Sequence, residues 1–114
     1  MVILKEKVTL DELMHIETQT FFYDMMKCVV DVGKGLLAVN AELHADLESY
    51  LLEQGSRQSD LYGFNILEDG EIEFDSLINP PRNREAGFPR AGRYVADPEA
   101  RKRIEEVVDQ WLQR

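Results

Sequence analysis

The segment Lys27-Cys-Val-Val-Asp-Val-Gly-Lys-Gly-Leu-Leu-Ala-Val-Asn40 has the pattern of a β-hairpin and predicts a sheet at the centre of the fold. Two runs rich in apolar and β-branched residues flank Gly33-Lys34-Gly35, which has the composition of a hairpin turn. A two-residue turn at Gly33-Lys34 pairs Cys28 with Val39. This register gathers five apolar side chains on one face of the hairpin, which predicts a core on that side: Cys28, Val30, Val32, Leu37 and Val39.

A second hairpin is predicted at residues 61–67 and 71–78, on either side of Glu68-Asp69-Gly70. A two-residue loop would place apolar side chains opposite charged ones. A three-residue loop with Gly70 in the left-handed conformation pairs Ile66 with Ile72 instead. The hydrophobic pattern therefore favours the three-residue loop, which leaves three acidic side chains together on the opposite face: Glu71, Glu73 and Asp75.

The N-terminal part of the chain predicts a short strand followed by a helix. Residues 2–4 are apolar and read as the opening strand. Thr9-Leu-Asp-Glu12 fits a capping box, in which the Thr9 hydroxyl and the Glu12 carboxylate each accept a hydrogen bond from a free backbone N–H group. We expect the helix that starts there to end near residues 19–23.

Two further helices are predicted from their start signals. Asp46 is the expected N-cap of a helix over about 47–54, and Gly55 stands where a left-handed residue ends it. Asp97 followed by Pro98 begins the last helix. The apolar residues of this helix recur at helical spacing: Ile104, Val107, Val108, Trp111 and Leu112.

The predicted order of elements is strand, helix, two strands, helix, two strands, helix. Hairpins with one apolar face need helices to cover them. We therefore expect an α+β fold with a mainly antiparallel sheet of about five strands and helices packed largely on one face. The chain has 114 residues, the length of one domain. Residues 1–114 are expected to form a single globular domain with a long irregular loop at about 79–96.

Composition excludes several classes of protein. A formal net charge of −9 disfavours binding to nucleic acid and to anionic lipid. No apolar run reaches the roughly 20 residues that span a membrane, and the N-terminus lacks the apolar stretch of a signal peptide. Cys28 is the only cysteine, which excludes an intramolecular disulfide and suits a reducing compartment. We expect an acidic cytoplasmic protein with no nucleic-acid partner, no membrane partner and no cofactor.

Positive charge outside the last helix is concentrated in the predicted irregular loop, which carries four arginines: Arg82, Arg84, Arg90 and Arg93. Guanidinium and amide groups between prolines suit bidentate contact with a carboxylate or a phosphate. A small anionic ligand is one expected partner of this loop. The alternative is that the arginines fold back onto the acidic strand face of this chain or of a second copy.

The densest group of potential ligand side chains is Glu42-Leu-His-Ala-Asp-Leu-Glu48. In an extended segment, Glu42, His44 and Asp46 share one face and are weak candidates for metal ligands. The alternative is a polar strand-to-helix junction, in which Asp46 caps the helix and His44 makes one hydrogen bond. Because no second histidine lies nearby, an oxygen-liganded cation or no metal at all is favoured over zinc.

Leu43-His-Ala-Asp46 with Glu48 is followed by Gly55-Ser56 with Gln58, and later by Ser76-Leu-Ile-Asn79. Together these motifs resemble the pattern of a small, uncharacterised prokaryotic protein family. The family has no assigned activity, so the resemblance implies no reaction and no catalytic residue. It does imply a candidate polar site formed by the residues that match the pattern: His44, Asp46, Glu48, Ser56, Gln58, Asn79, Asn83 and Arg84.

The sequence therefore favours a small ligand- or partner-binding domain, or a homo-oligomeric one, and leaves open whether it is an enzyme. The alternative is a small metal-assisted hydrolase acting on an anionic substrate, with Glu42, His44 and Asp46 as metal ligands. A shared site requires His44, Asn79 and Arg84 to converge on one cleft.

Overall fold

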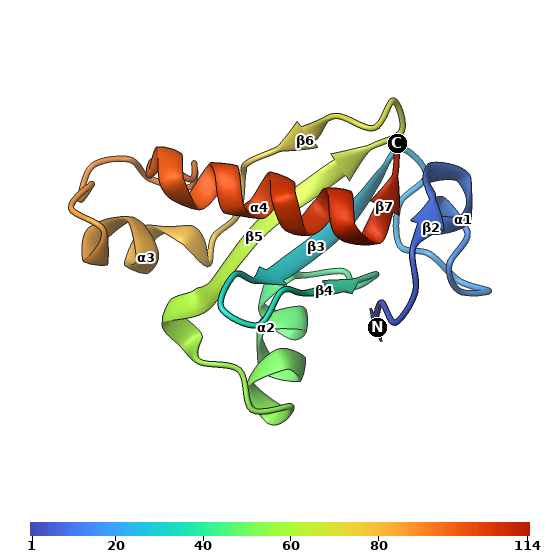
Figure 1. The fold of residues 1–114 in the computed structure, drawn as a ribbon, viewed down its shortest axis with the longest axis horizontal. Coiled ribbons are helices and arrows are strands. Elements are labelled where there is room, and N and C mark those ends of the chain that lie inside the picture. Colours follow the sequence, from blue (N-terminus) through green and yellow to red (C-terminus); the bar gives the residue numbers. More distant parts are fainter.

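A five-stranded antiparallel sheet forms the centre of the computed structural model, which describes residues 1–114 (Figure 1). This confirms the α+β class predicted from the sequence. The strands lie in the order β1 (Val2–Ile3), β4 (Leu36–Val39), β3 (Met25–Asp31), β5 (Leu61–Leu67) and β6 (Ile72–Glu73). Close to the two ends of the chain, β2 (Val8–Thr9) pairs in parallel with β7 (Leu112–Gln113).

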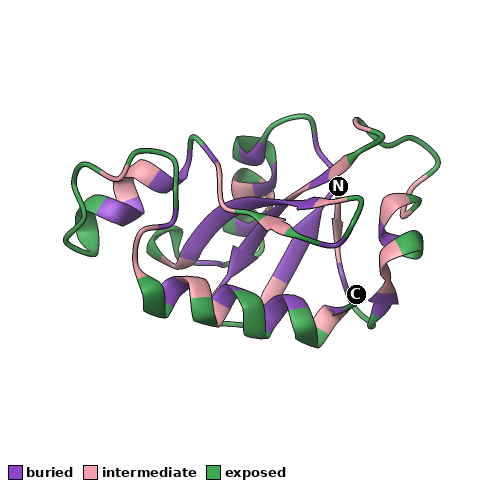
Figure 2. Ribbon diagram, turned by 90° about the horizontal axis from the view of Figure 1, so that it is seen from above, coloured by how far each residue is buried: buried purple, intermediate pink, exposed green.

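Helices cover both faces of the sheet, which differs from the expected packing on one face. The helices are α1 (Leu10–Met14), α2 (His44–Glu53), α3 (Asn79–Glu85) and α4 (Pro98–Trp111), with a 3-10 turn at η1 (Gln58–Asp60). Figure 2 shows the sheet lying between α4 and α2, with buried and exposed residues alternating along α4. The physical reason is that β3 and β5 carry apolar side chains on both faces, so each face needs a cover.

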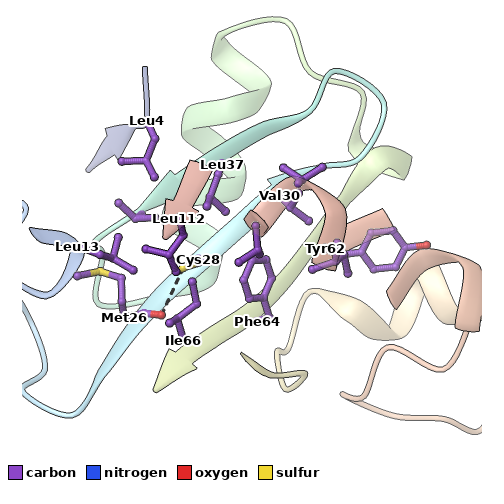
Figure 3. Close-up of a cluster of buried hydrophobic side chains, with 14 of the residues drawn as sticks. Leu4, Leu13, Met26, Cys28, Val30, Leu37, Tyr62, Phe64, Ile66 and Leu112 are labelled. Atoms are coloured by element: carbon purple, nitrogen blue, oxygen red, sulfur yellow. Dashed lines mark hydrogen bonds between the residues drawn. The ribbon is translucent and has the colours of Figure 1, made fainter. Parts of the chain in front are cut away.

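Two apolar clusters lie on the two sides of the sheet. On the side of α4, Cys28, Val30 and Phe64 pack in a cluster of 17 buried residues that also includes Ile104 and Val107 of α4 (Figure 3). Burial raises the pKa of the Cys28 thiol, and this side chain is part of the core. On the side of α2, seven buried residues form a smaller cluster: Val29, Ala38, Ala41, Leu47, Leu51, Leu61 and Ile78.

Both predicted hairpin registers are confirmed. Cys28 pairs with Val39 in the first hairpin, and Ile66 pairs with Ile72 in the second. Gly70 has the left-handed φ of 89° that the three-residue loop requires. The ladder of β6 ends at Glu73, however, so this strand is much shorter than the predicted run of residues 71–78.

Helix starts agree with the sequence better than helix ends. Thr9 forms the predicted capping box with Glu12, and Asp97 caps α4. The expected end of the first helix is wrong, since α1 stops at Met14. The expected N-cap at Asp46 is also wrong: α2 begins at His44 because the chain is extended only as far as Leu43, and Asp46 lies in the first helical turn.

The predicted irregular loop contains a short helix. Helix α3 begins at Asn79 and places Pro80 and Pro81 in its first turn, where a missing N–H group costs no helical hydrogen bond. Within the predicted loop, the part without helix or strand is reduced to residues 86–96. Among all the helices, none combines the length and the apolar character needed to cross a membrane.

Candidate functional site

A row of three polar side chains crosses the sheet on the face that α2 covers. Lys27 of β3 pairs with Asn65 of β5, and Asn65 pairs with Glu73 of β6. Side chains two residues apart in a strand share a face, so Lys27 lies on the same face as the buried Val29. The row of polar side chains is therefore next to the apolar cluster on the side of α2. The row therefore replaces the apolar core with polar groups at one end of the sheet.

A cavity of about 270 Å³ lies between this polar row and the start of α2. Leu43, His44 and Ala45 contribute its helical wall. The remaining polar lining consists of the row itself together with two further charged side chains: Lys27, Asn65, Glu73, Asp75 and Arg93. The cavity thus brings together charges of both signs with two neutral polar groups.

His44 is a buried, neutral histidine at the first residue of α2. Its Nε2 lies 2.9 Å from the carbonyl oxygen of Phe64, and because a carbonyl can only accept, Nε2 carries the proton and donates it. Burial is the largest effect and lowers the pKa of His44. The hydrogen bond to Phe64 raises it, the nearby Lys27 lowers it further, and Asn65 and Asp75 raise it by smaller amounts. The other ring nitrogen, Nδ1, is therefore an acceptor in the neutral ring.

The lowered pKa of His44 makes the stability of the fold depend on pH. Between the folded pKa and the ordinary value of 6.5, the unfolded chain binds a proton that the folded chain does not. The contribution of His44 to stability is therefore fully present above about pH 6.5 and is lost as the pH falls through the folded pKa.

The substitution His44→Gln keeps a donor for the carbonyl of Phe64 but does not titrate. We expect it to remove the contribution of His44 to the pH dependence of the free energy of unfolding, measured by urea unfolding between about pH 7.5 and 5. If the free energy of unfolding falls equally with pH in the wild type and in the variant, His44 is not the source of this pH dependence.

Asn65 is the buried polar group whose bonding is incomplete. Its side chain is only 4% exposed, and Nδ2 donates to Oε1 of Glu73 at 2.9 Å. Its Oδ1 is buried and has no hydrogen-bond partner, and it is the only buried side-chain nitrogen or oxygen atom in this condition. Exchanging the two amide atoms would set an oxygen against the Glu73 carboxylate, so the orientation is fixed by its partner. Unpaired buried groups are rare and need an explanation.

Gly63 organises the polar residues behind the cavity. A Cβ atom at this position would lie 2.3 Å from Oγ of Ser76 and 3.2 Å from Cγ of His44, so only glycine fits. On the open edge of β5, Asn79 accepts from the N–H of Gly63 and donates to its carbonyl, each at 2.9 Å. The Asn79 side chain thus replaces the neighbouring strand, which explains why β6 can end early.

The rest of α3 is anchored in the same way. Arg82, only 4% exposed, donates through Nε to the carbonyl of Leu61 at 2.8 Å and forms an ion pair with Glu48 of α2. Asn83 donates to the carbonyls of Gly92 and Tyr94 and accepts from the N–H of Ala96, so it holds the segment after α3. Glu48, Asn79 and Asn83 belong to the candidate polar site expected from the resemblance, and each stabilises the fold around α3.

The other residues that match the pattern lie elsewhere. Ser56 donates to the buried carboxylate of Asp31 at 2.6 Å, beside the first hairpin turn. Gln58 is exposed in η1. Arg84 is exposed and forms no ion pair, whereas Arg93 folds back onto Asp75 of the same chain, with Nε 2.7 Å from Oδ1. His44 and Asn79 are brought together around Gly63, but Arg84 is not among the residues lining the cavity.

The candidate metal ligands do not form a group. Because α2 starts at His44, the extended geometry that would align Glu42, His44 and Asp46 is absent. Glu42 and Asp46 line a different cavity, of about 440 Å³, while His44 faces the polar row. No three histidine, cysteine or acidic side chains are arranged to hold a metal ion. The geometry gives the metal-assisted hydrolase no support.

Lys27, Asn65 and Glu73 were not recognised as a site in the sequence. Their signal is a polar residue in an otherwise apolar strand, and it becomes a pattern only when the hairpin registers are combined. Lys27 and Asn65 belong to strands separated in the chain by a helix, so no local motif connects them.

Comparison with known proteins gives one family. A family model described as "Protein of unknown function (DUF5674)" matches residues 2–111. No curated protein and no solved structure matches the chain. The match agrees with the resemblance to an uncharacterised family, and it carries no activity.

Proposed function

The chain belongs to the DUF5674 family of proteins of unknown function, and we propose that it binds a small polar ligand in the cavity at the start of α2. The observation that carries this proposal is Asn65, a residue that lines the cavity and whose Oδ1 is buried without a hydrogen-bond partner. An unpaired buried acceptor costs about 1–3 kcal/mol. A ligand that donates a hydrogen bond to this atom offsets that cost.

The charges around the cavity support an anionic group on the ligand. The Lys27 ammonium lies 5.0 Å from the centre of the Phe22 ring and forms no ion pair. The N-cap of α2 is Leu43, whose side chain makes no capping hydrogen bond, so the helix start retains free N–H groups and a partial positive charge. A carboxylate or phosphate between Lys27 and this helix start would meet donors on both sides.

We expect Asn65→Leu to leave the free energy of unfolding unchanged or to raise it by about 1 kcal/mol, because leucine removes the unpaired buried oxygen at similar volume. Asn83→Leu is the matched control, since Asn83 is 1% exposed and all its polar atoms are paired. That substitution should cost about 2–3 kcal/mol. Urea unfolding measures both. If both variants lose the same free energy of unfolding, Asn65 has a structural role only.

Binding is tested by NMR with ¹⁵N-labelled protein and a set of small carboxylates, phosphates, amines and amides. A compound that occupies the cavity shifts the backbone signals of Leu43, His44 and Ala45 and the side-chain amide signal of Asn65. The Asn65→Leu protein, folded but without the acceptor, should bind such a compound about tenfold more weakly. If no compound shifts these signals, the cavity is not a ligand site.

Several wider expectations remain part of the proposal. The net charge of −9 supports a protein that does not bind nucleic acid, and the lone buried Cys28 supports a reducing, cytoplasmic environment. Two aromatic residues in the segment before β3 are exposed, Phe21 at 56% and Tyr23 at 99% of their accessible surface. They support homo-oligomerisation through that surface. Light scattering of concentrated protein tests this, and a monomer would exclude it.

A further inference from the structure

The order of groups along the polar row defines what a ligand must carry. Lys27 presents a positive charge, Asn65 an unpaired acceptor, and Glu73 a negative charge, on three neighbouring strands. Neighbouring strands are about 4.8 Å apart, so the row extends over about 10 Å. A complementary ligand has a negative group, a hydrogen-bond donor and a positive group in the same order and at similar spacing.

Each end of the cavity is reinforced by a second element. At the Lys27 end, the start of α2 adds free N–H groups from the turn that contains His44. At the Glu73 end, Asp75 also lines the cavity, while Arg93 neutralises only one of these two carboxylates. The cavity therefore has a positive side and a negative side, with the neutral Asn65 and His44 between them.

The geometry points to a free, short zwitterionic amide of the dipeptide class as the ligand of this cavity, an inference that rests on the proposed function. The carboxylate would lie between Lys27 and the start of α2, the amide N–H would donate to Oδ1 of Asn65, and the ammonium would contact Glu73. A cavity of about 270 Å³ has room for a small molecule of the size of glycylglycine. A lone phosphate or carboxylate would leave the Glu73 side of the cavity unpaired.

The test is an NMR titration of the full chain with glycylglycine and two matched compounds. 5-Aminopentanoate has the same backbone length and both charges but no amide N–H, and N-acetylglycylglycine keeps the amide and the carboxylate but has no ammonium. We expect glycylglycine to shift the signals of Leu43, His44, Ala45 and Asn65, and each matched compound to bind about tenfold more weakly.

Protein variants connect each ligand group to its partner. Glu73→Gln should weaken the binding of glycylglycine and leave N-acetylglycylglycine unaffected, whereas Lys27→Met should weaken both. Both side chains lie outside the buried core, so we expect both variants to fold, and thermal unfolding is the check. Equal binding of 5-aminopentanoate and glycylglycine, or equal effects of Glu73→Gln on both peptides, would overturn the dipeptide class.

The two proposals fail in different ways. If glycylglycine causes no shift while another small compound shifts the NMR signals of the residues lining the cavity, the cavity is a ligand site and the dipeptide class is wrong. If none of the small compounds shifts them, the cavity is not a ligand site and both proposals are wrong.

Discussion

We expect the Arg82→Met substitution to lower the free energy of unfolding by about 3 kcal/mol, measured by urea unfolding. Arg82 is almost fully buried and donates both to the carboxylate of Glu48 and to the carbonyl of Leu61. Methionine fills similar space but donates nothing, so a carboxylate with a side chain only 15% exposed and a backbone oxygen lose their partner. Removing one member of a buried ion pair is among the largest single-residue effects known in folded proteins.

Two further variants separate the ion pair from simple loss of a side chain. Arg84 lies in the same helix, is exposed and forms no ion pair, so Arg84→Met should change stability by less than about 0.5 kcal/mol. Adding Glu48→Leu to Arg82→Met removes the uncompensated charge and should restore more than about 1 kcal/mol. Additive effects of the two substitutions would show that Glu48 and Arg82 do not stabilise each other.

The second large effect is expected at Asn79. Asn79→Ala removes three hydrogen bonds at once: one from the N–H of Gly63, one to the carbonyl of Gly63 and one to the carbonyl of Arg93. The N–H and the carbonyl of Gly63 would then lose their partner beside a fully buried position, while the carbonyl of Arg93 keeps the hydrogen bond from the N–H of Ser76, so we expect a loss of about 3 kcal/mol in urea unfolding. The start of α3 and the segment that carries Arg93 should both detach from the edge of β5.

Hydrogen exchange gives a readout that a general loss of packing would not produce. In Asn79→Ala, the amide of Gly63 should exchange much faster, because its acceptor is the Asn79 side chain. The amide of Val30, on the neighbouring strand, should change only as far as global stability changes. Asn79→Asp keeps the acceptor and loses both donors, so it should protect Gly63 while still destabilising the fold. If the exchange rate of the Gly63 amide is unchanged in Asn79→Ala, the Asn79 side chain does not protect this edge of β5.

The sequence predicts the sheet well because its signals are local. Turn composition and two-residue alternation are sufficient to choose the register of each hairpin, and the pairing of apolar with apolar residues distinguishes the two loop lengths of the second hairpin. The start of α2 is different: Asp46 is a good N-cap residue, but the helix begins three residues earlier than expected, with His44 beside Gly63. Tertiary contact here overrides a local preference.

The candidate site shows the same division. The motifs pointed to polar residues, among them Asn79 and Asn83, that are buried and hydrogen-bonded within the chain. An amide group in the sequence does not reveal whether its partner is a ligand or a strand edge. The row formed by Lys27, Asn65 and Glu73 was missed because its members come from three strands and carry no common spacing.

By itself, the sequence determined the α+β class, both hairpin registers and two helix caps, because each of these depends on residues close together in the chain. Three features follow from packing in space instead: α2 and α4 cover opposite faces, Asn79 of α3 takes the place of a strand at the edge of β5, and Oδ1 of Asn65 is buried without a partner. The physical reason is that burial and pairing are properties of a position in space, and residues distant in the sequence supply the partners.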